Sequence, residues 1–187
     1  MTTPRLLAVS LIVFAGACAP PWTTLQQSGP PPALQGAQMI TLAFNFAELN
    51  IDGQPIDQVI PTLAPDERAD LEGAFTDMQG AFMEEFSSRV SVPVQLAAGP
   101  PAPGEVRAEV AFTFIQRGTR GPIGFSNTEV VGQIRWSVGG QTTDAIEMLR
   151  ISKPSLTRPS VAQRMRICAS QLGSLTARFF EREQGRQ

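Results

Sequence analysis

The chain has 187 residues, a formal net charge of -2, and 42% hydrophobic and 17% charged residues. This balance is typical of one folded domain and excludes an intrinsically disordered chain. The small net charge excludes the strongly basic surface with which proteins usually hold nucleic acid. Because the sequence contains no histidine, it lacks the usual base of a serine or cysteine triad and the commonest zinc ligand.

The amino-terminal segment has the three parts of an export signal. Arg5 supplies positive charge, residues 6–14 are almost all apolar, and small residues at 15–17 precede Cys18. The apolar run is much shorter than the ~20 residues that a helix needs to cross a bilayer. We therefore predict a signal peptide over residues 1–17, removed before Cys18.

The string Ala15-Gly16-Ala17-Cys18 resembles the lipobox of bacterial lipoproteins, although Ala15 stands where leucine is usual. The resemblance implies that Cys18 becomes the mature amino terminus and carries fatty acid, such as palmitate. Several acyl chains make such an anchor effectively permanent. Ala19 implies transport to the outer membrane under enterobacteria-like sorting. The alternative is an ordinary signal peptide followed by an incidental cysteine.

Prolines and glycines interrupt residues 18–37, which show no hydrophobic period. Proline-rich chain prefers an extended form that rises about 3.1 Å per residue. We predict that residues 18–37 are a tether able to hold one globular domain, residues 38–184, up to roughly 50 Å from the lipid.

Alternation of apolar and polar residues predicts five strands in the domain. Their ranges are 38–46, 92–96, 106–115, 128–138 and 142–151. In the third strand we expect one inward face made of Val106, Ala108, Val110, Phe112 and Phe114. Gly139-Gly140 between the last two strands is typical of a tight hairpin turn.

Two segments change to the period of an amphipathic helix. Residues 62–89 contain one apolar stripe, and the segment after Ser160 contains another; Ser160 and Gln163 fit a capping box. Cys168 lies on the second stripe, which favours a core position over a reactive thiol or an intermolecular bridge. The stripes consist of Leu71, Phe75, Met78, Phe82 and Phe86, and of Val161, Met165, Cys168, Leu172, Leu175 and Phe179.

The element order is therefore β-α-β-β-β-β-α. Each helix has one apolar side that requires a partner surface, and a sheet face is the simplest one. We predict the α+β class, as a two-layer sandwich with a mainly antiparallel sheet covered by two helices.

No pattern of side chains indicates catalysis. The run from Glu48 to Gly53 begins like a calcium loop, but Val59 stands where the twelfth-position glutamate is required, so an Asp-Gly turn is favoured. The carboxylates of the first helix share one element and cannot face each other across a substrate; they are Asp66, Glu67, Asp70, Glu72 and Asp77. We expect no enzymatic activity, no cofactor and no metal site.

The loop from Arg117 to Asn127 is the strongest candidate for partner binding. Arg117, Arg120 and Phe125 are residue types that dominate binding energy at interfaces, and arginines also bind phosphate or carboxylate. The alternative is a solvated hairpin loop. Four arginines of the last helix, namely Arg164, Arg166, Arg178 and Arg182, are expected to face solvent.

Taken with Cys18, the proline-rich tether, the helix containing Asp66 to Arg89, the strands from Val106 to Ile151 and the closing helix, the chain resembles small envelope lipoproteins of Gram-negative bacteria. The ABC-type transport auxiliary lipoproteins are one such group, and the penicillin-binding-protein activator and curli-secretion lipoproteins are another. The resemblance implies a non-enzymatic component that docks to an envelope protein partner, anchored in the outer membrane and facing the periplasm. A lipid- or glycan-binding carrier and a carboxylate-dependent cell-wall hydrolase are the alternatives, and the oligomeric state stays open.

Overall fold

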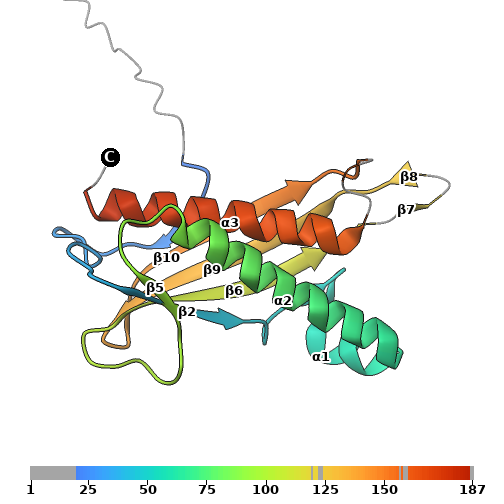
Figure 1. Ribbon diagram of the computed structural model, residues 1–187, viewed down its shortest axis with the longest axis horizontal. Coiled ribbons are helices and arrows are strands. Elements are labelled where there is room, and N and C mark those ends of the chain that lie inside the picture. Colours follow the sequence, from blue (N-terminus) through green and yellow to red (C-terminus); the bar gives the residue numbers. More distant parts are fainter. Residues whose placement is uncertain (1–19, 119, 122–123, 156, 158–159, 186–187) are drawn as a thin grey trace, which may run out of the picture.

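A computed structural model describes residues 20–118, 120–121, 124–155, 157 and 160–185. They form an α+β sandwich in which two long helices cover one face of an eight-stranded sheet (Figure 1). The predicted fold class is confirmed, and the principal elements follow the predicted order β-α-β-β-β-β-α. The sheet is mixed, because β2 runs parallel to both β5 and β6.

The main path of the sheet follows the order β1-β10-β9-β6-β2-β5. The principal strands are β2 (Ile40–Asn45), β5 (Val94–Leu96), β6 (Val106–Gln116), β9 (Thr128–Val138) and β10 (Gln141–Ser152). Shorter elements are β1 (Thr23–Gln26), β3 (Asn50–Ile51), β4 (Gln54–Pro55), β7 (Arg120–Gly121), β8 (Gly124–Phe125), helix α1 (Ile56–Val59) and a 3-10 turn (Ile60–Thr62).

The hairpin between β9 and β10 turns where the sequence predicted. Gly139 and Gly140 have φ angles of 58° and 87°, a pair of left-handed positions that glycine adopts without steric cost.

Strand β6 departs from the predicted alternation. Its pairing with β9 slips between Phe112 and Phe114, as in a β-bulge, so that Ile115 is buried and Phe114 is only partly buried. One extra residue in a strand reverses the faces of all that follow. The prediction that Phe114 points into the core is therefore wrong.

The two long helices are α2 (Pro65–Ser87) and α3 (Val161–Glu183). Every predicted stripe residue is buried except Val161, which is partly buried. Pro65 begins α2, and Ser160 caps α3 by accepting a hydrogen bond from the Gln163 backbone N–H at 3.1 Å.

Aromatic side chains fill the space between the sheet and the helices. Trp136 of β9 is fully buried, with ring centroids 5.5 Å from Phe180 and 6.2 Å from Phe86. The helices approach closely at Gly173, where a Cβ atom would lie 2.5 Å from the Phe82 carbonyl oxygen. A closed aromatic core therefore joins the sheet to both long helices.

The segment predicted to be a spacer instead packs on the domain. Strand β1 pairs with the outer strand β10, and the Trp22 ring lies edge-on to Phe179 at 5.8 Å. Leu34 is fully buried, and its carbonyl accepts a hydrogen bond from the Gln184 side chain. Burial of large apolar side chains outweighs the extended preference of the prolines around them. The prediction of a long free tether is wrong for residues 22–37, whereas Cys18 lies outside the described residues.

Candidate functional site

Arg117, predicted to bind a partner, is held at the base of its loop by Asp52. Its Nε lies 2.7 Å from Asp52 Oδ2, and its backbone N–H donates to Asp52 Oδ1 at 2.8 Å. Asp52 and Gly53 have φ angles of 50° and 86°, so the carboxylate belongs to the tight turn predicted in place of a calcium loop. Arg117 is thus engaged in an ion pair whose two side chains are each 40% exposed.

The other two predicted binding residues lie apart from this ion pair. Arg120 of β7 and Phe125 of β8 are opposite each other in a small antiparallel ladder. Their side chains lie outside the described part of the structure. Partner binding by Arg120 and Phe125 therefore stays a prediction.

Arg164 of α3 lies at the base of the same loop and contacts both of its ends. The sequence did not predict this role. The Arg164 side chain is fully buried, and its Nε donates to Thr128 Oγ1 at 2.8 Å. The Thr128 hydroxyl in turn donates to the Arg117 carbonyl at 2.7 Å. The prediction that Arg164 faces solvent is wrong, and the missed signal was its position four residues before Cys168 on the apolar stripe.

The remaining arginines of α3 differ in exposure. Arg166 and Arg178 are exposed as predicted, whereas Arg182 is half-buried. The Arg182 guanidinium lies 5.0 Å from the Trp22 ring centroid and forms an ion pair with Glu183 at 2.7 Å. The side of α3 that was predicted to face solvent therefore contacts the amino-terminal segment, through Arg182 and Trp22.

Cys168 occupies the core. Its Sγ lies 3.6 Å from the Arg150 carbonyl oxygen, and burial raises the pKa of the thiol to about 12. A thiol with so high a pKa holds almost no thiolate near neutral pH and is a poor nucleophile. The core interpretation of Cys168 is confirmed.

The carboxylates of α2 are exposed on the outer side of that helix and face solvent. Among the described residues, no group of three or more acidic or cysteine side chains is arranged to hold a metal ion. Within the same part of the chain, no helix is both long and apolar enough to cross a bilayer.

The sheet face opposite the helices carries polar side chains that bond to one another. Asn45 donates to Glu109 at 2.8 Å, and Gln133 donates to Glu147 at 2.9 Å. A hollow of about 390 Å³ opens on this face, lined partly by Arg107, Glu109 and Arg135. We call this surface the open face; its central residues are Asn45, Glu109, Gln133, Arg135 and Glu147.

The open face ends in an apolar row that crosses three strands. Phe114 of β6 pairs with Val131 of β9, which pairs with Leu149 of β10. Paired residues lie on the same side of a sheet, so the three side chains are neighbours. Leu149, at the sheet edge, is 46% exposed. The open face therefore combines a centre of hydrogen-bonded polar side chains with an apolar row at its margin.

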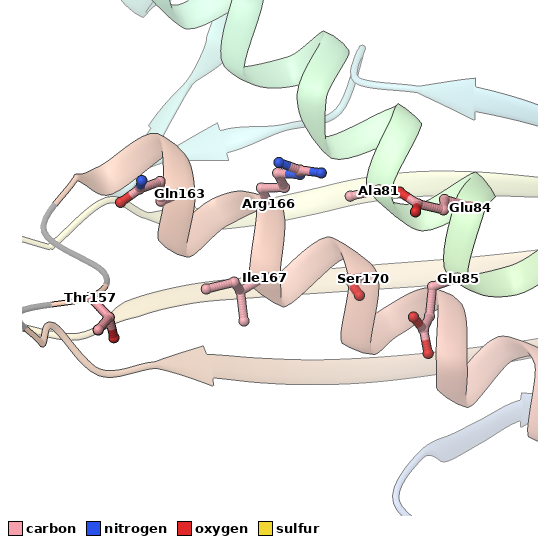
Figure 2. A pocket seen from close by; sticks show the side chains of 8 residues that line it. All are labelled: Ala81, Glu84, Glu85, Thr157, Gln163, Arg166, Ile167 and Ser170. Carbon is pink, nitrogen blue, oxygen red and sulfur yellow. The ribbon is translucent and has the colours of Figure 1, made fainter.

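A second groove, of about 330 Å³, lies on the helix side of the molecule. Figure 2 shows Arg166 reaching from α3 toward Ala81 and Glu84 of α2, with Ser170 and Glu85 farther along the groove. Its lining is mostly polar and charged, and it lies outside the aromatic core. The groove is therefore a surface feature and not a cavity between sheet and helices.

No protein-family model matches this chain, and no curated protein matches it. Solved structures do resemble it. A PelC dodecamer from Paraburkholderia phytofirmans is 13% identical, with 82% of this chain and 97% of that chain covered and a TM-score of 0.41. A minor lipoprotein from Acinetobacter baumannii is 9% identical, with 81% and 95% covered and a TM-score of 0.35. A DUF330 protein from Xanthomonas campestris is 10% identical, with 89% and 97% covered and a TM-score of 0.39.

Proposed function

We propose that this chain is a lipid-anchored protein of the bacterial cell envelope that docks to a larger envelope complex through its open face and catalyses no reaction. The anchor is the acylated Cys18 implied by the lipobox. The observation that carries the docking role is the contrast between a filled core on one side of the sheet and an uncovered face with an apolar row on the other. In this proposal the anchor lies in the outer membrane and the domain faces the periplasm.

Two alternatives have less support. A carrier of lipid or glycan needs a lined cavity, whereas Phe86, Trp136 and Phe180 occupy the space between helices and sheet. A cell-wall hydrolase needs two carboxyl groups facing each other across a cleft, whereas the α2 carboxylates point to solvent.

The anchor is tested by replacing its thiol. We expect Cys18→Ser to release the protein from the membrane fraction, because no acyl chain can be attached. Mass spectrometry of the native amino-terminal peptide provides the direct measurement. An unmodified Cys18, or a Cys18→Ser chain that stays in the membrane, would contradict the proposed anchor.

Docking is tested by photocrosslinking in intact envelopes. A photoreactive residue at Gln133 on the open face should yield one adduct of defined mass, whereas the same residue at the exposed Thr76 of α2 should not. Adding Val131→Asp should lower the Gln133 adduct about tenfold, because a charge is inserted into the apolar row. The same yield from both positions, or phospholipid adducts alone at Gln133, would contradict docking through this face.

A further inference from the structure

The described chain begins very close to the proposed anchor. Only Ala19 separates Cys18 from Pro20. Since consecutive Cα atoms are about 3.8 Å apart, the Cα of Pro20 lies within about 8 Å of the Cα of Cys18 in any conformation. A lipid attached to Cys18 therefore holds Pro20 at the surface of the bilayer.

Pro20 is connected to a segment that is fixed to the domain. The Trp22 ring lies edge-on to Phe179, and the Arg182 guanidinium lies over both rings. Thr23 pairs with Glu147 of β10. Downstream, the Ser28 backbone N–H donates to the buried Asp144 carboxylate at 2.8 Å. The domain cannot move away from the anchor without breaking these contacts. Strand β1, which follows the anchored segment directly, and its partner β10 form one edge of the sheet (Figure 1).

The same edge exposes apolar side chains. Leu25 of β1 is 51% exposed, and Leu149 and Ile151 of β10 are 46% and 44% exposed. These are three of the five large hydrophobic residues exposed in the described part of the chain. Apolar side chains at this position are suited to the boundary between headgroups and acyl chains.

Cations lie along the same strand and on the helix that packs on it. Lys153, which follows β10, and Arg178 of α3 are exposed, and Arg150 of β10 is partly buried. Burial and the like charge of Arg178 lower the pKa of Arg150. The carboxylates close by are Asp144 and Glu147, which accept hydrogen bonds from Ser28 and Gln133, and Glu129, which lies opposite Ile151 in the β9–β10 ladder. The exposed ammonium of Lys153 and guanidinium of Arg178 favour contact with an anionic surface.

We propose that the edge formed by Leu25, Leu149, Arg150, Ile151, Lys153 and Arg178 lies on the bilayer that holds the anchor and binds the headgroups of anionic phospholipids. We call it the membrane-facing edge. The inference rests on the lipid proposed for Cys18. Because the short connection keeps the edge at a high local concentration near the bilayer, individually weak contacts are sufficient. Leu149 lies where this edge meets the open face, and the rest of the open face, including Phe114 and Val131 of the apolar row, is left accessible to a partner.

The test uses two matched leucines on opposite edges of the sheet. Leu149 lies on β10 and Leu96, 55% exposed, on β5, four strands away or about 19 Å. Each is replaced by cysteine in the lipidated chain and labelled with a fluorophore, since Cys18 is blocked by its lipid and Cys168 is buried. The proteins are inserted into vesicles of phosphatidylethanolamine and phosphatidylglycerol that contain a headgroup nitroxide. We expect several-fold stronger quenching of the label at Leu149→Cys than at Leu96→Cys.

Equal quenching at the two positions on a chain whose Cys18 is acylated would overturn the membrane-facing edge and leave the anchor intact. An unmodified Cys18 in the mass spectrum would instead remove the anchor and this inference together. The two failures are thus distinguishable in one preparation.

A second measurement tests the role of charge. The double variant Lys153→Glu with Arg178→Glu should lower quenching at position 149 at least twofold, because anionic headgroups are then repelled. The matched control is Arg68→Glu with Arg166→Glu, which makes the same charge change at exposed sites of α2 and α3 away from the edge. Identical quenching in both double variants would overturn the binding of anionic headgroups by this edge.

Discussion

The two faces of the central sheet are made by alternate residues of the same strands, yet they have different roles. On the covered face of β9, Ile134 and Trp136 are fully buried beneath the helices. On the open face of the same strand, Gln133 and Arg135 are partly exposed and interact with polar neighbours. The free energy of folding therefore depends mainly on the covered face, and the open face is the surface that we propose for docking.

The largest expected difference in stability between the two faces comes from substitutions at two neighbouring residues of β9. Trp136→Ala should lower the free energy of unfolding by about 3–5 kcal/mol, because a large buried side chain is replaced by a cavity. Arg135→Ala should cost less than about 1 kcal/mol, since its hydrogen bond to Gln133 at 3.2 Å and its ion pair with Glu48 at 3.7 Å both lie at the surface. Urea unfolding measures both. Comparable losses would show that the open face contributes to stability as much as the covered one.

The same comparison applies to α3. Arg164→Ala should cost about 2–3 kcal/mol, because the buried Thr128 hydroxyl loses a charged hydrogen-bond donor. Arg166→Ala, two residues away and exposed, should change stability by less than about 0.5 kcal/mol. Thermal and chemical denaturation of both variants provide the measurement, and a loss below 0.5 kcal/mol in both would contradict the anchoring role of Arg164.

Two helical glycines sharpen the contrast between packed and solvated surfaces. Gly173→Ala should destabilise by about 1–3 kcal/mol, because its Cβ would overlap the Phe82 carbonyl in the helix crossing. Gly80→Ala, where no atom lies within 4 Å of the added Cβ, should stabilise by about 0.5–1 kcal/mol through better helix propensity. The two substitutions are expected to change the free energy of unfolding in opposite directions. A gain in stability from Gly173→Ala would mean that the two helices can move apart without cost.

A further expected effect is the pH dependence of the free energy of unfolding caused by the buried Cys168 thiol. Burial raises the thiol pKa from 9.0 to about 12, so the unfolded chain loses its proton first as pH rises. Stability from this group is complete below pH 9 and decreases toward pH 12, by about 1.4 kcal/mol between pH 8 and pH 10. Cys168→Ala should remove that portion of the pH dependence in urea unfolding. An identical decrease in both proteins would assign it to other groups.

Local periodicity predicted most of the covered side of the sandwich. The stripes on α2 and α3, the Gly139-Gly140 turn and the core position of Cys168 all agree with the structure. These features depend on residues three or four apart on a helix, or two apart on a strand. Such spacings are set by backbone geometry alone.

The candidate sites were predicted less well. The bulge that turns Phe114 to the open face arises from pairing with β9, and it creates the apolar row. Arg164 was assigned to solvent by its charge, although its place on the stripe predicts burial and Thr128 provides the partner. For Arg164, position on the stripe was a better guide than charge. For Phe114, the local alternation was itself misleading, because no local pattern specifies the bulge.

The sequence by itself determined the α+β class and the two apolar stripes, because each is encoded by residues close together in the chain. The export signal with its lipobox cysteine stays a prediction from a local pattern of the same kind. Only the tertiary structure decided that residues 22–37 lie against β10 and α3, since Trp22 and Phe179 meet although they are far apart in sequence. It also decided which sheet face is left uncovered. Contacts of this kind depend on the folded arrangement of whole elements, and no local pattern specifies them.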